Sequence, residues 1–310
     1  MLRESKKLNN LVLQMNIAII GVGLIGGSFA LALRRAYGDT RSGLHVIGVD
    51  RDAGALDDAL RKGVIDEAAS LAAVAECELI VIAVPVRQFP AVLAEISPFL
   101  NAETVITDVG STKQDVIAAA RAALGSKISR FVPGHPIAGR EHAGVAAAAP
   151  ELFEDKKVVL TPLAENTPQT IERVHALWRS CGADVVQMPA ETHDAIFAAV
   201  SHLPHLLAFA LVDELAARPN AKTLFSFAAS GFRDFTRIAG SNPEMWRDIT
   251  LNNREALLGE LDAYEAHIVE LRKALESSDG DALEALMARA KHARDRWMAG
   301  ELDGFRDEAI

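Results

Sequence analysis

Aromatic residues and cysteine are scarce in this chain of 310 residues. Phe, Trp and Tyr together make up 5% of the sequence, so the core must be built mainly from Leu, Val, Ile and Ala. The two cysteines, Cys77 and Cys181, lie far apart in the chain, without a CxxC pair or nearby histidines. This pattern argues against a disulfide framework and against a metal site, and we expect a reducing, cytoplasmic location.

Positive charge is also in short supply. The formal net charge is −10, and Lys and Arg form no stripe of the kind that binds a phosphate backbone. We therefore expect no nucleic-acid partner, although a few local arginines could still bind an anionic small molecule.

One segment, 11–33, has no charged residue and is long enough to suggest a membrane helix. It contains four glycines, however, and it divides into a strand, a turn and a helix. It also has no basic region and cleavage site of the kind that mark a signal peptide, so we predict no membrane segment.

Short apolar runs alternate with helical patterns in the first part of the chain. Several runs are continuous in Val, Ile and Leu, as expected for parallel strands covered by helices on both faces. They predict an α/β fold with a doubly wound, Rossmann-like sheet. The predicted strands are residues 16–20, 45–49, 79–84, 104–107, 130–132, 157–160 and 185–188. The predicted helices between them are 27–35, 88–99, 114–124 and 170–181.

After about Pro189 only helical periods remain, which predicts a C-terminal domain that is all helical. The length also favours two domains, at the usual ~150 residues each. The predicted helices are 192–217, 222–227, 244–277 and 282–299. The predicted parts are an N-terminal extension (1–15), a Rossmann-like dinucleotide-binding domain (16–189), a helical domain (190–300) and a charged tail (301–310).

A GxGxxG motif lies directly after the first predicted strand, at the start of a helix. In this fingerprint Gly21 allows the tight turn, Gly23 lets a pyrophosphate approach, and Gly26 permits close packing of helix on strand. The second strand ends in Asp50, at the spacing of a carboxylate that binds ribose hydroxyls, which favours NAD. Arg51 could pair with a 2′-phosphate, so use of NADP stays open, as do a solvated Arg51 and a glycine turn without a cofactor. The expected cofactor contacts are Gly21, Gly23, Leu24, Ile25, Gly26, Asp50, Arg51, Val84 and Pro85.

Further polar residues occupy positions suited to a ligand site. Ser111, in DVGSTK after the fourth strand, could be a helix N-cap as well as an active-site hydroxyl. His135, in GHPIAG after the fifth strand, lies on a predicted loop, which favours a ligand-facing role. His202 and His205 flank Pro204, which should kink its helix, and they could equally be core residues.

The last motif covers 231–239 and 243–248 and is rich in arginine and aspartate. The Arg–Asp pairs at 233–234 and 247–248 are consistent with surface ion pairs, which contribute little. Arg237, next to an apolar residue, is the better candidate for a fork that binds a carboxylate.

Taken in this order, GVGLIGGS, DVGSTK, GHPIAG, SHLPH, DFTRIA and PEMWRD resemble the prephenate/arogenate dehydrogenase family of tyrosine biosynthesis. The matches run from about residue 16 to 250, and GHPIAG and SHLPH are more specific than the glycine loop. The resemblance implies a homodimer whose helical domains interlock, with the active site in the cleft between domains. It also implies NAD-dependent oxidative decarboxylation of prephenate to 4-hydroxyphenylpyruvate, and it leaves arogenate, which would give tyrosine, open as a second substrate.

The resemblance also implies roles for single residues. His135 resembles the family's catalytic histidine, bonded to the ring C4 hydroxyl, and Ser111 resembles the serine that orients this histidine near the nicotinamide. Arg237 resembles the arginine that holds a substrate carboxylate. The implied substrate-binding residues are Arg237, His205 and His202, with Trp246 and Asp234 supporting the arginine. Contacts of the alanine-rich segment 141–154 are left open.

Two other interpretations remain. Another reductase of this architecture, such as a β-hydroxyacid dehydrogenase or an imine reductase, would be expected to use a donor such as lysine from the helical domain. No such residue stands out between Pro189 and Asp213. A non-catalytic NAD-sensing protein would not need His135, Ser111, His205 and Arg237 together.

Overall fold

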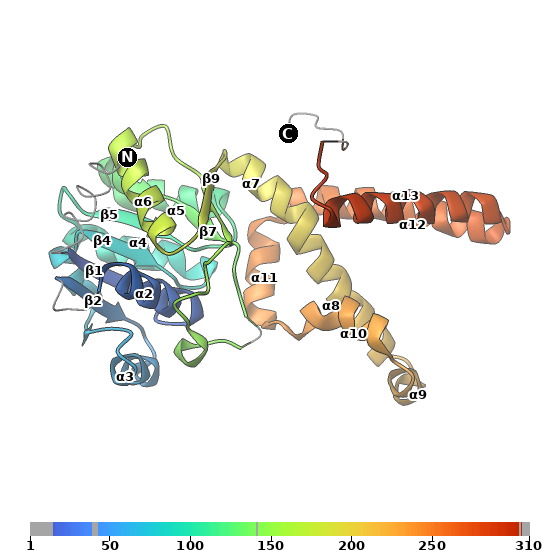
Figure 1. The fold of residues 1–310 in the computed structure, drawn as a ribbon, viewed down its shortest axis with the longest axis horizontal. Coiled ribbons are helices and arrows are strands. Elements are labelled where there is room, and N and C mark those ends of the chain that lie inside the picture. The colour runs from blue at the N-terminus through green and yellow to red at the C-terminus, as the bar shows by residue number, and fades with distance from the viewer. Residues whose placement is uncertain (1–14, 39–42, 141, 304, 306–310) are drawn as a thin grey trace.

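The structure is a computed structural model that describes residues 15–38, 43–140, 142–303 and 305. The predicted extension, apart from Met15, and most of the predicted tail lie outside these residues. Figure 1 shows a sheet domain from which long helices extend to one side. The two expected architectures, a doubly wound α/β fold followed by an all-helical part, are confirmed.

Six parallel strands form the main sheet, in the order β3-β2-β1-β4-β5-β6. The chain enters the sheet in its interior, through β1, and β2 and β4 pair with opposite edges of that strand. The strand order therefore reverses at β1, which is where ligands bind in folds of this kind. The strands are β1 (Met15–Ile20), β2 (Leu44–Val49), β3 (Glu67–Ala68), β4 (Leu79–Ile82), β5 (Val105–Asp108) and β6 (Phe131–Val132).

Helices cover both faces of this sheet. They are α2 (Leu24–Tyr37), α3 (Ala53–Arg61), α4 (Phe89–Ile96), α5 (Gln114–Leu124) and α6 (Pro168–Ser180). Neighbouring residues of β1 point to opposite layers, since Ile17 packs in the cluster with α2 and α6, and Ala18 in the cluster with α4 and α5. Cys77 and Cys181 are free and buried in different layers, and burial raises the pKa of each thiol to about 12.

A second, three-stranded sheet differs from the predictions. β7 (Gly134–Pro136) pairs antiparallel with β8 (Lys157–Leu160), which pairs parallel with β9 (Asp184–Gln187). The prediction that His135 lies on a loop is wrong, because this residue lies in β7 opposite Val159. A strand of three residues that contains Gly and Pro has no periodicity that sequence patterns could detect.

The helical part is built around one long rod, which runs from α7 through a π-helical segment (Ala198–His202) into α8. The π-helical segment ends two residues before Pro204, which has no N–H to donate, so the predicted irregularity takes this form. The predicted helix 244–277 is divided near Asn253, and α10 was not predicted. The helices are α7 (Ala190–Phe197), α8 (Leu203–Ala216), α9 (Ala221–Ser226), α10 (Ser230–Thr236), α11 (Pro243–Asn252), α12 (Arg254–Glu276) and α13 (Gly280–Met298).

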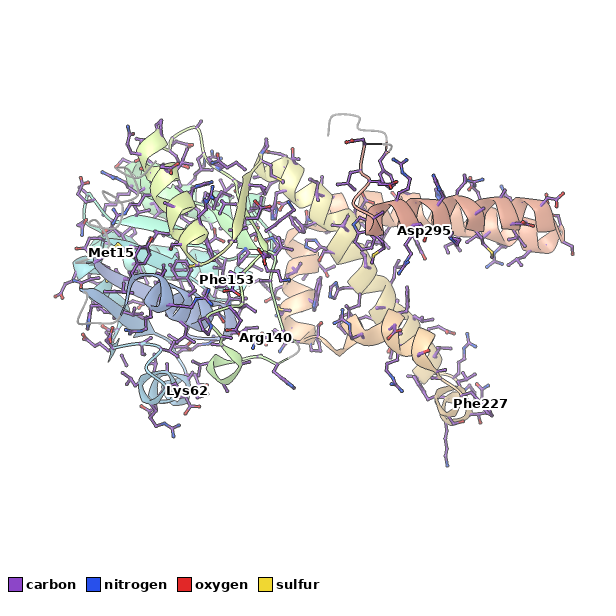
Figure 2. The ribbon with its side chains drawn as sticks, viewed as in Figure 1. Met15, Lys62, Arg140, Phe153, Phe227 and Asp295 are labelled. Carbon is purple, nitrogen blue, oxygen red and sulfur yellow. The ribbon has the colours of Figure 1, made fainter. Side chains whose placement is uncertain are left out.

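The helical part exposes much apolar surface. Helices α12 and α13 form a hairpin that projects away from the sheet (Figure 1). Helices α8, α9 and α10 form a second arm, and Figure 2 shows Phe227 at its outer end. Among the described residues, the rod Ala190–Ala216 is the one helix long and apolar enough to cross a membrane by length and composition, and 22% of its apolar window is buried. Exposed large side chains include Val200, Phe227, Leu275, Met287, Trp297 and Met298. So many exposed large apolar side chains in one part of a molecule are typical of an interaction surface.

Gly26 lies where α2 comes close to β1, and it yields a first prediction. A Cβ atom there would meet the Gly21 carbonyl oxygen at 2.3 Å and Ile19 Cγ2 at 2.8 Å, whereas one on Gly23 would meet nothing within 4 Å. We expect Gly26→Ala to lower the free energy of unfolding by about 2 kcal/mol, because the helix must move off the strand. Gly23→Ala is the matched control and should cost less, at most about 1 kcal/mol, since only the preference for glycine over alanine at an N-cap is lost. Urea denaturation followed by circular dichroism measures both, and equal stabilities would contradict this account of the packing.

Candidate active site

The glycine loop between β1 and α2 is shaped to receive phosphate. Gly21 has φ +97°, and a Cβ atom on it would meet the Ala83 carbonyl oxygen at 2.4 Å, so only glycine fits there. Gly23 is the N-cap of α2 and provides no side-chain cap. The first N–H groups of this helix are therefore available to an anion, as its dipole also favours.

Asp50 lies beside this loop at the end of β2. Its Oδ2 accepts a hydrogen bond from the Val22 N–H at 2.8 Å, and its Oδ1 accepts one from the Asp52 N–H at 3.0 Å. Arg51 is exposed. The residues Val84 and Pro85 follow β4, the strand that pairs with β1 on its other side. An open turn, an uncapped helix and a carboxylate at the carboxyl ends of adjacent strands together fit an NAD molecule.

A chain of hydrogen bonds joins His135 to the helical part. His135 Nδ1 lies 2.9 Å from His193 Nε2, and His193 Nδ1 lies 2.8 Å from Asp194 Oδ1. The Asp194 carboxylate also accepts the backbone N–H groups of Lys113 and Gln114, both at 2.9 Å. A side chain from α7 thus caps the start of α5, and Ser111 is not the cap of this helix.

This chain fixes which nitrogen of each ring carries a proton. A carboxylate can only accept, so His193 Nδ1 donates to Asp194, and Nε2 of a neutral His193 must accept from His135. His135 then carries its proton on Nδ1 and has the lone pair of Nε2 available. Burial is the main reason why the pKa of His135 lies well below its usual value, and electrostatic interactions with His193, Lys113 and His202 act in the same direction. A neutral imidazole with a fixed lone pair has the geometry that a general base needs.

The helical part contributes a second group of rings. The His205 ring stacks on Trp246, with centroids 3.5 Å apart and planes at 19°. His202 is buried beside them, and its Nδ1 lies 3.1 Å from Asn253 Nδ2. Burial lowers the pKa of His202 to about 4 and also lowers that of His205. The charge of Arg237 contributes to the second shift, so this guanidinium lies close to His205.

Other predicted contacts do not form directly. Within the described parts of the chain, no hydrogen bond joins Ser111 to His135, and Asp234 is exposed on α10 without a hydrogen bond or ion pair. Asp248, considered for a surface ion pair with Arg247, is buried, with its Oδ1 2.8 Å from Arg247 Nε. In the same residues, no group of three or more His, Cys, Asp or Glu is arranged to hold a metal ion.

Sequence reasoning missed the partners of His135. His193 and Asp194 were overlooked because both lie inside a segment that was treated only as a helix. The signal that could have found them is a His–Asp pair in an otherwise apolar helix, where two polar residues need buried partners. Asp108 and Lys113 were also missed, although both belong to the DVGSTK motif.

Comparison with known proteins gives a consistent result. Two family profiles match the chain, "Prephenate dehydrogenase, nucleotide-binding domain" over residues 29–187 and "Prephenate dehydrogenase, dimerization domain" over residues 189–289. The chain is 40% identical to the prephenate dehydrogenase of Bacillus subtilis over 283 residues, which are 90% of this chain and 75% of that relative. It is 37% identical to the cyclohexadienyl dehydrogenase of Zymomonas mobilis over 285 residues, covering 90% of this chain and 94% of the relative.

A solved structure is also similar to this chain. It is the prephenate dehydrogenase from A. aeolicus in complex with hydroxyphenyl propionate and NAD+, with a TM-score of 0.83 and 36% identity. The match covers 91% of this chain and 98% of the solved one.

Asp50 provides a test of the dinucleotide site. We expect Asp50→Ala to raise the Kd for NADH by at least about tenfold, because a charge-assisted hydrogen bond contributes about 1.5–3 kcal/mol. The Kd for NADPH should change less, since the charge that repels a 2′-phosphate is also removed. Fluorescence titration of both nucleotides measures the two constants.

Asp52→Ala is the matched control for this substitution. The Asp52 side chain caps α3 by accepting from Gly54 and Ala55 N–H groups, so its loss should cost about 1 kcal/mol of stability. Its Kd for NADH should stay at the wild-type value. An unchanged Kd in Asp50→Ala would remove this carboxylate from the cofactor site.

Proposed function

Because this chain belongs to the prephenate dehydrogenase family, we propose that His135 is the general base of its reaction, the NAD-dependent oxidative decarboxylation of prephenate. The observation that carries the proposal is the chain Asp194–His193–His135. These contacts leave His135, in strand β7, as a neutral imidazole with its lone pair on Nε2. The glycine loop, the start of α2 and Asp50 would hold the cofactor.

The proposed step removes a proton and a hydride from the same alcohol. NAD, when bound, supplies the acceptor for the hydride of ring C4. His135 Nε2 accepts the proton of the C4 hydroxyl as the hydride leaves. The bond between the ring and its carboxylate then breaks, its electron pair enters the ring, and the proton returns from His135 to the C4 oxygen. The products are 4-hydroxyphenylpyruvate, CO2 and NADH. Since the ring becomes aromatic, the side chains mainly have to position the substrate and receive one proton.

The second group of side chains would hold the substrate. Arg237 is proposed to bind a carboxylate, and the rings of His205, His202 and Trp246 to line the pocket. The indole N–H of Trp246 is buried without a partner among the described residues, so it is a donor that a ligand could use. The roles of Ser111 and Asp234 stay predictions. Arogenate differs from prephenate only in the side chain, and we extend the proposal to it as a second substrate.

We also propose that the enzyme is a homodimer formed through the helical part. The rod Ala190–Ala216 is apolar along most of its length yet has 22% of its apolar window buried, and several large side chains of α12 and α13 are exposed. A second copy of the same surface would cover these side chains without an additional partner. The cytoplasmic location stays a prediction.

The assay that tests the function is the appearance of NADH absorbance when the protein is mixed with NAD and prephenate. We expect NADH from the wild type, and a kcat lower by about 10²–10⁴-fold in His135→Asn, which loses the proton acceptor. The affinity for NADH should be unchanged in this variant.

His45→Asn is the matched control, because His45 lies near the start of β2, far from the carboxyl ends of the strands. It should keep the wild-type kcat. No NADH with prephenate or arogenate would refute the proposed function, and activity with a hydroxyacid alone would favour the alternative reductase. A wild-type kcat in His135→Asn would refute the role of this residue.

Arg237 gives a separate prediction about substrate binding. We expect Arg237→Gln to raise the KM for prephenate by roughly ten- to hundredfold with a smaller change in kcat, because it removes a charge-assisted bond. Arg218→Gln is the control, since Arg218 makes an exposed ion pair with Glu214 on the same part of the molecule. If KM stayed at its wild-type value while the unfolding temperature fell, Arg237 would be structural.

A further inference from the structure

A fully buried ion pair lies directly behind His135. The side chains of Lys113 and Asp108 both have 0% exposure, and the Lys113 ammonium contacts the Asp108 carboxylate. Lys113 Nζ also donates to the Gly134 carbonyl oxygen at 2.7 Å, and Asp108 Oδ1 accepts the Gly134 N–H at 2.9 Å. One ion pair therefore holds both polar backbone atoms of the residue that precedes His135.

The position of this pair does not follow from a need for stability. Burial removes water from both charges, and an apolar pair of similar volume is often at least as stable. The pair is nevertheless enclosed at the carboxyl end of β5, where Asp108 Oδ2 also accepts the Gly110 N–H at 2.8 Å. A hypothetical Cβ atom on Gly134 would lie 3.0 Å from the Asp108 carbonyl oxygen, so β7 lies tightly against this strand end. What the pair achieves is a fixed backbone at Gly134.

Lys113 reaches His135 by a second route. Its backbone N–H donates to Asp194 Oδ1, the same oxygen that lies beside His193 Nδ1. His193 in turn holds Nδ1 of His135. The side chain of Lys113 thus fixes the backbone before His135, and its main chain anchors the residues that fix the ring.

The electrostatic surroundings of His135 include Lys113 as a positive charge. The titratable groups that face the two histidines come from several elements. Asp108 lies at the end of β5, Lys113 at the N-cap of α5, His193 and Asp194 on α7, and His202 on the π-helical segment. Burial is the main reason why the pKa of His135 is lowered, and the charges of His193 and Lys113 act in the same direction. Loss of the ammonium alone would also leave Asp108 as an unpaired negative charge, so the pKa of His135 would rise.

We propose that Lys113 is a positioning residue for His135, which it orients through Gly134 and keeps unprotonated in the pH range of the reaction. This inference rests on the proposed function, because it assumes that His135 must accept a proton.

The test compares Lys113→Met with the wild type. In the wild type, kcat/KM for prephenate falls at low pH as His135 becomes protonated, and in Lys113→Met this fall should occur at a pH higher by roughly one unit. The kcat at the pH optimum should drop by about tenfold or more, because a small misplacement of the base slows the reaction. Histidine NMR on labelled protein, with His135 assigned by its loss in His135→Asn, should show the same rise in the pKa of this ring.

Two further variants keep the test decisive. Asp108→Asn/Lys113→Met leaves no unpaired charge, so it should fold even if the single variant does not. In this double variant the pKa of His135 should lie near its wild-type value. The kcat should stay reduced, because the Gly134 carbonyl oxygen still has no side-chain donor. Lys127→Met is the matched control, since Lys127 Nζ donates to the Ser97 and Leu100 carbonyl oxygens at 2.9 and 3.0 Å on another part of the sheet domain. It should match the wild type in both readouts.

The outcomes separate the two proposals. A double variant with wild-type kcat, or a folded Lys113→Met whose His135 titrates as in the wild type, would overturn the role of Lys113. A wild type that makes no NADH would overturn the proposed function, while the NMR titration would still decide whether Lys113 controls the protonation of His135.

Discussion

The Asp194 carboxylate is the interaction on which the rest of the site depends. It comes from the first helix of the helical part, yet it accepts hydrogen bonds from two backbone N–H groups of the sheet domain and from His193. Although burial raises its pKa, the hydrogen bonds from His193, Gln114 and Lys113 lower it overall, so the group stays ionised. Because an ionised carboxylate can only accept, the proton positions on His193 and then on His135 follow from it. The contact between the two parts of the molecule therefore also sets the tautomer of His135, the proposed base.

How far the sequence predicts this site depends on the distance along the chain between the groups involved. The glycine loop and Asp50 are read from local spacing, because a strand, a turn and a helix must follow one another to bind a dinucleotide. His135 could be selected by its motif, but its partner His193 is 58 residues away and the contact depends on tertiary packing. The same limit applies to β7, which forms only because β8 offers it an edge. Nothing in the sequence marks Lys113 as a buried residue, since a lysine at the start of a helix is usually solvated.

The rod that carries Asp194 and His193 has two surroundings along its length. Near its start, His193 and Asp194 are buried against the sheet domain, and Asn253 ties the Asp194 carbonyl oxygen to the region between α11 and α12. Farther along, Val200 has 66% of its surface exposed on this chain alone. Val200 and His193 lie on this one continuous rod, so a partner that covers Val200 would contact the element that carries His193. In the proposed dimer, assembly and the geometry of the base would be connected through one element.

The charge balance of the site also explains why a protein with a net charge of −10 can bind an anion with two carboxylates. The buried histidines His135, His193 and His202 all have lowered pKa values, so they add no positive charge of their own. In the proposed site the attraction would come mainly from Arg237, because the buried Lys113 is paired with Asp108. A base whose pKa lies far below neutral is a weak proton acceptor in the free protein. Carboxylates of a bound substrate would raise the pKa of His135 toward the working range, so the imidazole would become an effective base only when the substrate is in place.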